Sequence, residues 1–138
     1  RDCLPPAIGP AVGVCGEVPA YHPLDAGAMM NPLLTERCRE LPSGTPPLSA
    51  SDAAALLANL DGWTVRDGRE LVREFRFDNY YQTIAFVNGT AVVSHREDHH
   101  PDLEVGYNYC RVRFSTHAIG GLSENDFICA AKADALLV

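Results

Sequence analysis

The chain has 138 residues, of which 46% are hydrophobic and 21% are charged, and its formal net charge is −7. These values are typical of one globular domain with a real core, and the negative charge argues against a nucleic-acid-binding surface, which needs basic patches. No apolar run approaches the length of a membrane span. We therefore expect a single domain that binds neither nucleic acid nor a membrane.

The cysteines also restrict the class of protein. There are five, Cys3, Cys15, Cys38, Cys110 and Cys129, and no two are spaced as Cys-x-x-Cys. This odd number and spacing favour neither a disulfide framework nor a zinc ribbon. Cys110 and Cys129 lie in apolar contexts and are predicted to be small buried residues. The pattern fits a reducing, cytoplasmic setting.

Residues 1 to about 47 are rich in Pro, Gly and Ala and show no sustained period. We expect residues 1–45 to be an extension ahead of a domain at 46–138. Met29 and Met30 stand where an initiator can lie, so residues 1–28 are expected to be upstream sequence and dispensable for activity. The alternative is the remnant of a targeting segment, although the apolar residues at 12–14 are too few for a signal peptide.

The domain is predicted to begin with a helix and a hairpin. Ser49 is a good N-cap, and the helix-forming run 53–60 places Leu56, Leu57 and Leu60 on one side and stops at Asp61-Gly62. A short strand over 63–66 and a longer one over 70–77 follow, joined by the turn signal Asp67-Gly68.

The second half repeats this order and adds a last helix. A helix from 79 to about 96, capped by Asp78, is predicted to bury an apolar stripe. That stripe consists of Tyr81, Ile84, Ala85, Ala91, Val92 and His95. Strands over 103–107 and 109–115 follow, and Ser123 caps a final helix with Asp126 at the capping-box position. The expected buried face of this helix consists of Phe127, Ala130, Ala131 and Leu137.

The element order is helix, two strands, helix, two strands, helix. Strand hairpins separated by a helix predict an α+β fold, with a four-stranded antiparallel sheet and three helices on one face, α-β-β-α-β-β-α.

Four of the five histidines lie between positions 95 and 126. His99 and His100 fall at a helix-to-strand junction and His117 at a strand end, where the rim of a scaffold carries sites. Histidine titrates near neutral pH, so the cluster suggests proton transfer or metal binding. A zinc site of His95, His99 and His117 is the competing interpretation, although Arg96 stands where a zincin motif has Glu.

The histidine stretch contains a spaced set of residues, His95, His99-His100-Pro101, Tyr107, His117 and Asp126. It is accompanied by Leu48-Ser49, Gly62-Trp63, Phe75-Arg76-Phe77, Ser115-Thr116-His117, Gly121-Leu122-Ser123 and Asn125-Asp126. In both the spacing and these accompanying residues, the chain resembles the pterin-4a-carbinolamine dehydratase family, also known as the dimerization cofactor of hepatocyte nuclear factor. The resemblance covers about residues 46–138. The position of Cys38, ahead of the Pro-Pro pair, resembles the bacterial members of the family. Many members have Glu where this chain has His95.

The resemblance implies a hydro-lyase, 4a-hydroxytetrahydrobiopterin dehydratase, which recycles the pterin used by an aromatic amino acid hydroxylase. It implies His99, His100 and His117 as the acid/base groups, with neither metal nor cofactor. Which histidine is the acid and which the base stays open. The substrate-binding positions it implies are Asp98, Ser115, Thr116 and Ala118. A homodimer or homotetramer is implied as well.

The sequence leaves open the role of Asp126, the role of Trp63 and the choice between an enzyme and a binding protein. Asp126 can orient a histidine or cap a helix, and Trp63 can border the pocket or belong to the core. His95 is a further supporting residue. The family also includes proteins that act as binding modules, as a dimerization cofactor or in carboxylase assembly, so a role in binding another protein is the alternative function.

Overall fold

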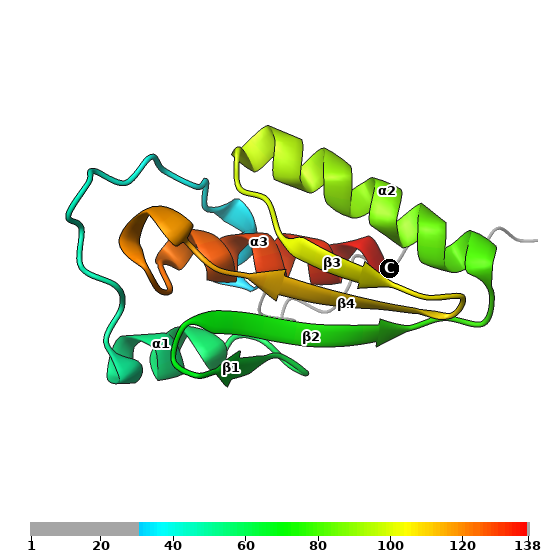
Figure 1. Ribbon diagram of the computed structural model, residues 1–138, viewed down its shortest axis with the longest axis horizontal. Coiled ribbons are helices and arrows are strands. Elements are labelled where there is room, and N and C mark those ends of the chain that lie inside the picture. Colours follow the sequence, from blue (N-terminus) through cyan, green and yellow to red (C-terminus); the bar gives the residue numbers. More distant parts are fainter. Residues whose placement is uncertain (1–30, 138) are drawn as a thin grey trace, which may run out of the picture.

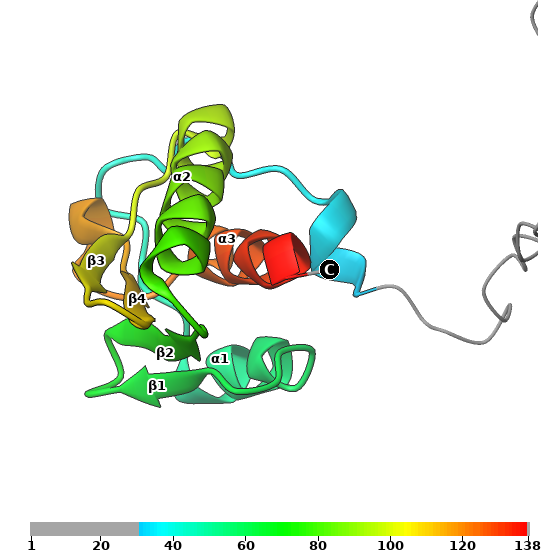
Figure 2. The ribbon, with the colours of Figure 1, turned by 90° about the vertical axis from the view of Figure 1, so that its right-hand side faces the viewer.

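The computed structural model describes residues 31–137 and has a four-stranded antiparallel sheet in the order β1-β2-β4-β3 (Figure 1). The three helices lie on one face of this sheet (Figure 2). The elements are α1 (Ala50–Leu57), β1 (Thr64–Arg66), β2 (Glu70–Arg76), α2 (Tyr80–Glu97), β3 (Asp102–Val105), β4 (Tyr109–Phe114) and α3 (Glu124–Asp134), with short 3-10 helices η1 (Pro32–Thr35), η2 (His117–Ile119) and η3 (Ala135–Leu137). The predicted fold class and element order are confirmed.

The core lies between the sheet and α3. Strands β2 and β4 pair in the centre, with Leu71 opposite Phe114 and Phe75 opposite Cys110, and all four side chains are buried. Every other residue of these strands points inward, as the period of a strand requires. The first turns of α3 supply Phe127, Cys129 and Ala130, which are fully buried; the two small residues among them let the helix pack close to the sheet.

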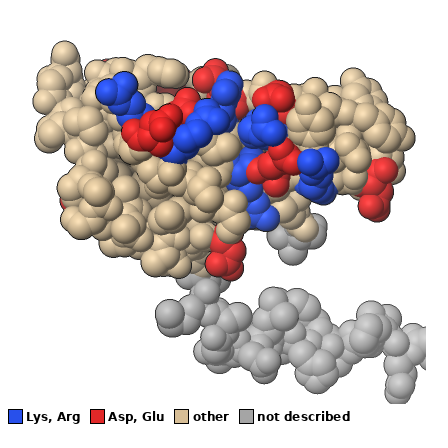
Figure 3. All heavy atoms as spheres, turned by 60° about the horizontal axis from the view of Figure 1, so that its bottom comes forward, with Lys and Arg blue, Asp and Glu red and all other residues tan. Residues whose placement is uncertain are grey.

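The outer face of the sheet carries charges of both signs. Arg111 lies between Glu74 and Glu104, with a nitrogen–oxygen distance of 2.7 Å to each. Arg66 pairs with Glu70 nearby. Positive and negative side chains therefore alternate over this face (Figure 3). None of the helices within residues 31–137 combines the length and hydropathy that a bilayer crossing requires.

The prediction for the buried side of α2 is wrong. The expected stripe faces solvent, with Tyr81 84% and Val92 52% exposed. The side chains that are buried instead are Thr83, Phe86, Thr90, Ser94 and Glu97. The helix begins after Asn79, whose side chain accepts the N–H of Gln82, so Asn79 and not Asp78 is the cap.

The C-terminal end of α3 differs from prediction in one residue. Phe127, Ala130 and Ala131 are buried as expected, but Leu137 lies in η3 and is 47% exposed. Asp134 occupies the last position of the helix and is tied to the core. It accepts hydrogen bonds from Trp63 Nε1 at 2.9 Å and from Arg73 at 2.8 Å.

A segment ahead of α1 packs on the helices. Leu33 of η1 is buried in the core, although the sequence places the start of the folded region near residue 46. Residues 36–41, called the strap below, then run between the end of α2 and the start of α3 (Figure 1). The Cys38 N–H donates to Glu97 Oε2 at 2.9 Å, and Asn125 bonds both backbone groups of Arg39.

Candidate active site

The turn after α2 separates two neighbouring histidines. Asp98 closes the helix in the left-handed conformation, with φ of 49°. The His99 N–H then returns to the Ser94 carbonyl at 3.1 Å. The residue in the left-handed region reverses the chain direction, as a C-cap does. As a result, the His99 side chain is largely buried and His100 is exposed.

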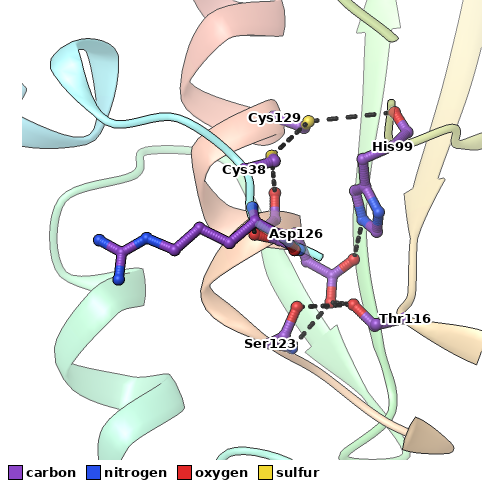
Figure 4. A network of polar contacts seen from close by, with 8 residues as sticks. Cys38, His99, Thr116, Ser123, Asp126 and Cys129 are labelled. Carbon is purple, nitrogen blue, oxygen red and sulfur yellow. Dashed lines mark hydrogen bonds and ion pairs between the residues drawn. The ribbon is translucent and has the colours of Figure 1, made fainter. Parts of the chain in front are cut away.

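His99 is held by a carboxylate, which Figure 4 shows, and by an aromatic ring. Its Nε2 lies 2.6 Å from Asp126 Oδ1, and its ring stacks on Phe114 with centroids 5.9 Å apart. The side chain is only 12% exposed. With an ionised Asp126, Nε2 carries the proton and Nδ1 is the nitrogen left free to accept one.

Asp126 combines the two roles that the sequence leaves open. While Oδ1 contacts His99, Oδ2 accepts the Ser123 N–H at 2.9 Å and the Thr116 hydroxyl at 2.8 Å (Figure 4). The Ser123 contact is half of a capping box at the start of α3. The residue is fully buried. One carboxylate therefore begins the helix and orients the imidazole.

The segment after β4 presents its residues to two cavities. Ser115 and His117 line a cavity of about 620 Å³ beside the β1–β2 turn. Thr116, Ala118 and Asp98 line a second cavity, of about 470 Å³. Three of the four predicted substrate-binding residues therefore border the second cavity. A single cleft shared by His99, His100 and His117 stays a prediction.

The strap forms the other wall of the second cavity, and sequence reasoning missed it. Residues 38–41 line this cavity together with Glu97 and Asn125. Burial raises the pKa of Glu97, but hydrogen bonds from Lys132 and the Cys38 N–H, with nearby Arg37, outweigh burial and lower it. Cys38 was the only signal in this stretch that the sequence offered.

The remaining candidates, Trp63 and His95, do not line this cavity. Trp63 is 4% exposed and packs against Phe75 and Phe114, so it belongs to the core. His95 is exposed on the last turn of α2. Within residues 31–137, no three His, Cys, Asp or Glu side chains are arranged to hold a metal ion, which gives the zinc interpretation no support. His22 lies outside the described residues.

Comparison with known proteins identifies the family. The family model described as "Pterin 4 alpha carbinolamine dehydratase" matches residues 46–136. A protein of Nitrosospira multiformis is 58% identical over 104 residues, covering 75% of this chain and 91% of its own length. One of Nitrosomonas europaea is 60% identical over 105 residues, covering 75% and 92%. Both carry the name "Putative pterin-4-alpha-carbinolamine dehydratase".

A solved structure agrees with the fold. It is a "transcriptional coactivator/pterin dehydratase" of Brucella melitensis, 33% identical, with a TM-score of 0.63. The match covers 65% of this chain and 97% of the other. Residues 46–136, which the family model matches, contain the turn after α2, the end of β4 and the start of α3, where the His99–Asp126 pair is formed. The chain therefore belongs to the pterin-4a-carbinolamine dehydratase family.

Proposed function

We propose that the protein is a 4a-hydroxytetrahydrobiopterin dehydratase, a hydro-lyase that acts by histidine general acid/base catalysis. It removes water from the pterin-4a-carbinolamine and gives quinonoid dihydropterin. The observation that carries the proposal is the contact between His99 and buried Asp126. Asp98, which precedes His99, and Thr116, which donates a hydrogen bond to Asp126, line a cavity of about 470 Å³. Membership of the family supports the substrate class.

The chemistry needs one acid and one base. The 4a-hydroxyl must be protonated to leave as water, and the N5 proton must be removed. Imidazoles can do both near neutral pH. His100 and His117 are exposed to solvent, and His117 lines the cavity of about 620 Å³, whereas His99 is fixed by Asp126 and offers Nδ1. The assignment of acid and base among the three stays open.

The substrate is proposed to occupy the cavity of about 470 Å³, which lies within the usual range for small-molecule sites. Asp98, Thr116 and Ala118 border it on one side and the strap on the other. Ser115 and His117 alternate with them along the same segment and line the other cavity, of about 620 Å³. Binding through backbone groups of residues 115–118 agrees with this arrangement, because the Thr116 side chain is occupied by Asp126 and Ser123.

The test is the dehydration rate of chemically prepared carbinolamine. Wild type should accelerate the reaction, and a chelator should leave the rate unchanged, since the proposed groups are imidazoles. Activity that disappears with chelator and returns with zinc would overturn the acid–base proposal. No acceleration at all, in a folded chain that binds no pterin, would refute the dehydratase function.

The cellular setting is proposed from the family. The protein would act in the cytoplasm, in tetrahydrobiopterin recycling, alongside an aromatic amino acid hydroxylase. We also propose that it forms at least a homodimer. The exposed face of α2, with Tyr81 and Val92, and the edge strand β3 offer apolar and backbone surface to a second copy. Light scattering that shows only monomer at micromolar concentration would contradict this.

A binding module is the second candidate. The name of the Brucella melitensis protein joins a coactivator to a dehydratase, and the exposed α2 face suits a protein partner. The dehydratase needs the histidines for proton transfer, whereas a binding module does not. A folded chain that binds pterin but shows no turnover, in wild type and histidine variants alike, would favour the binding module.

A further inference from the structure

Two cysteines from distant parts of the chain meet beside the candidate site. Cys38 lies in the strap and Cys129 in α3, and their sulfur atoms are 3.5 Å apart although 91 positions separate the residues (Figure 4). A disulfide bond is about 2.05 Å long, so the sulfurs need to approach by only about 1.5 Å. Both thiols are free.

The two thiols differ in access. Cys38 is half-buried and lines the cavity that the strap closes, so a small solute can reach it. Cys129 is fully buried, and its sulfur contacts the His99 carbonyl at 4.0 Å. An oxidant arriving from solvent therefore meets Cys38 first.

The two thiols also differ in chemistry. The hydrogen bond with Cys38, together with burial, raises the pKa of Cys129. Cys129 is therefore the less reactive thiol of the pair. Because Cys38 is also the sulfur that a solute can reach, we assign it as the thiol that meets the oxidant and Cys129 as the resolving thiol.

The strap holds Cys38 in place for this reaction. Its own N–H is bonded to Glu97, and Asn125 bonds the N–H and the carbonyl of Arg39 at 3.0 and 2.7 Å. These three contacts fix the backbone on both sides of the Cys38 side chain. The short movement that joins the sulfurs is then a side-chain rotation or a small shift of the strap, and α3 stays intact.

We propose that Cys38 and Cys129 are a redox-active dithiol, which hydroperoxides convert to a disulfide that ties the strap to α3. Cys38 gives up its proton, and its sulfur attacks the O–O bond and takes one oxygen as a sulfenic acid; the departing oxygen takes up the proton that Cys38 lost and leaves as the alcohol or water. The Cys129 thiol then attacks the Cys38 sulfur, the S–S bond forms, and the hydroxyl leaves as water with the thiol proton. Two thiols are oxidised by one peroxide, and an external dithiol reduces the disulfide to the two thiols while it becomes a disulfide itself.

The test uses the full chain with Cys3 and Cys15 replaced by Ser in every sample, which leaves three cysteines. After hydrogen peroxide treatment, a thiol titration under denaturing conditions should find one free thiol, that of Cys110. Peptide mapping without reductant should find Cys38 linked to Cys129, and dithiothreitol should restore all three thiols. Since the bridge closes a long loop, the urea midpoint of unfolding should rise on oxidation.

Cys110→Ser is the matched control, because Cys110 is buried in β4 and burial raises its pKa to about 11. This variant should form the same link, and Cys38→Ser should not. Peptide mapping of the chain in which only Cys3 and Cys15 are replaced gives its result whether or not these two variants fold. Three thiols left after treatment, over-oxidised Cys38 without a link, or a link that uses Cys110 would each overturn the proposal. The outcome is independent of dehydratase activity.

Discussion

His99 Nε2 and Asp126 Oδ1 lie 2.6 Å apart, although the two residues are 27 positions apart in the chain. Asp126 also accepts the Ser123 N–H that begins α3. The orientation of the imidazole therefore depends on the same carboxylate that starts the last helix. Folding of α3 and assembly of the site are coupled through this one side chain.

Asp126→Asn should lower kcat by about 10²-fold, because the amide no longer fixes the His99 tautomer. It should also lower the free energy of unfolding by about 1–3 kcal/mol, since buried donors lose a partner. Asp134→Asn is the matched control at the other end of α3. Steady-state kinetics should show a changed pH profile of kcat for Asp126→Asn alone. An equal kcat loss in both variants would contradict the positioning role.

His100→Ala and His117→Ala should each lower kcat toward the low end of the roughly 10²–10⁴-fold range for a lost proton-transfer group. Pterin affinity should fall less, because binding is spread over backbone groups, and the double variant should show no detectable catalysis. His99→Ala should in addition lower the melting temperature, since its ring packs on Phe114 and bonds Asp126. Kinetics and thermal melts check both. Undiminished kcat in all three variants would refute the site.

Glu97 should make the strap sensitive to acid. The pKa of Glu97 is lowered in the folded chain, so the unfolded chain binds its proton more tightly. Its stabilising contribution is complete above the ordinary glutamate pKa of about 4.3 and is lost as pH falls through the lower folded pKa. Glu97→Gln should have a lower urea midpoint of unfolding than wild type at pH 7. As the pH is lowered, its midpoint should fall less than that of wild type. Urea midpoints across pH measure this, and identical pH curves would contradict it.

Trp63→Phe should lower the free energy of unfolding by about 1–3 kcal/mol and leave kcat unchanged. Phe fills most of the space but removes the N–H that Asp134 accepts at 2.9 Å. Burial raises the pKa of Asp134, although the hydrogen bonds and charge from Trp63 and Arg73 lower it. Loss of the Trp63 donor therefore leaves a partly buried carboxylate with less compensation. Urea unfolding and kinetics separate the two effects. A kcat loss at unchanged stability would favour the pocket role that the sequence left open.

Removal of residues 1–28 should leave activity and stability unchanged, whereas removal of residues 1–45 should lower both. The longer deletion takes away Leu33, whose burial is worth about 1.5–3 kcal/mol, and the wall that the strap gives to the cavity. Thermal melts and the KM for carbinolamine compare the two truncations. Equal stability of both would show that the folded unit begins at 46.

The order of elements could be read from the sequence because the strands alternate cleanly and the helix caps are local signals. The caps Ser49 and Ser123 act on the first turn of their own helices, and the inward position of Cys110 follows from the alternation along its own strand. The His99–Asp126 contact was foreseeable only as one of two roles for Asp126. A hydrogen bond across 27 positions has no local signature.

The buried side of α2 was missed for a physical reason. The hydroxyls of Thr83, Thr90 and Ser94 bond to the carbonyls four residues earlier, at 2.9, 3.0 and 2.8 Å. With their polar atoms satisfied, these side chains pack as small apolar groups. Hydropathy counts them as polar and therefore points to the opposite side. The strap could not be predicted because long-range hydrogen bonds to its backbone hold it in place. Since any residue type supplies backbone groups, such bonds leave no pattern in the sequence.

The left-handed backbone at Asp98 decides which amino acids a library can sample there. With φ of 49°, this position costs a β-branched residue roughly 1–2 kcal/mol, whereas Gly and Asn enter it readily. A saturation library at position 98 should thus be sorted first by backbone geometry and only then by side-chain chemistry. Asp98→Gly and Asp98→Asn both keep the turn and both lack the carboxylate. A difference in activity between these two variants and wild type would therefore report on the Asp98 carboxylate.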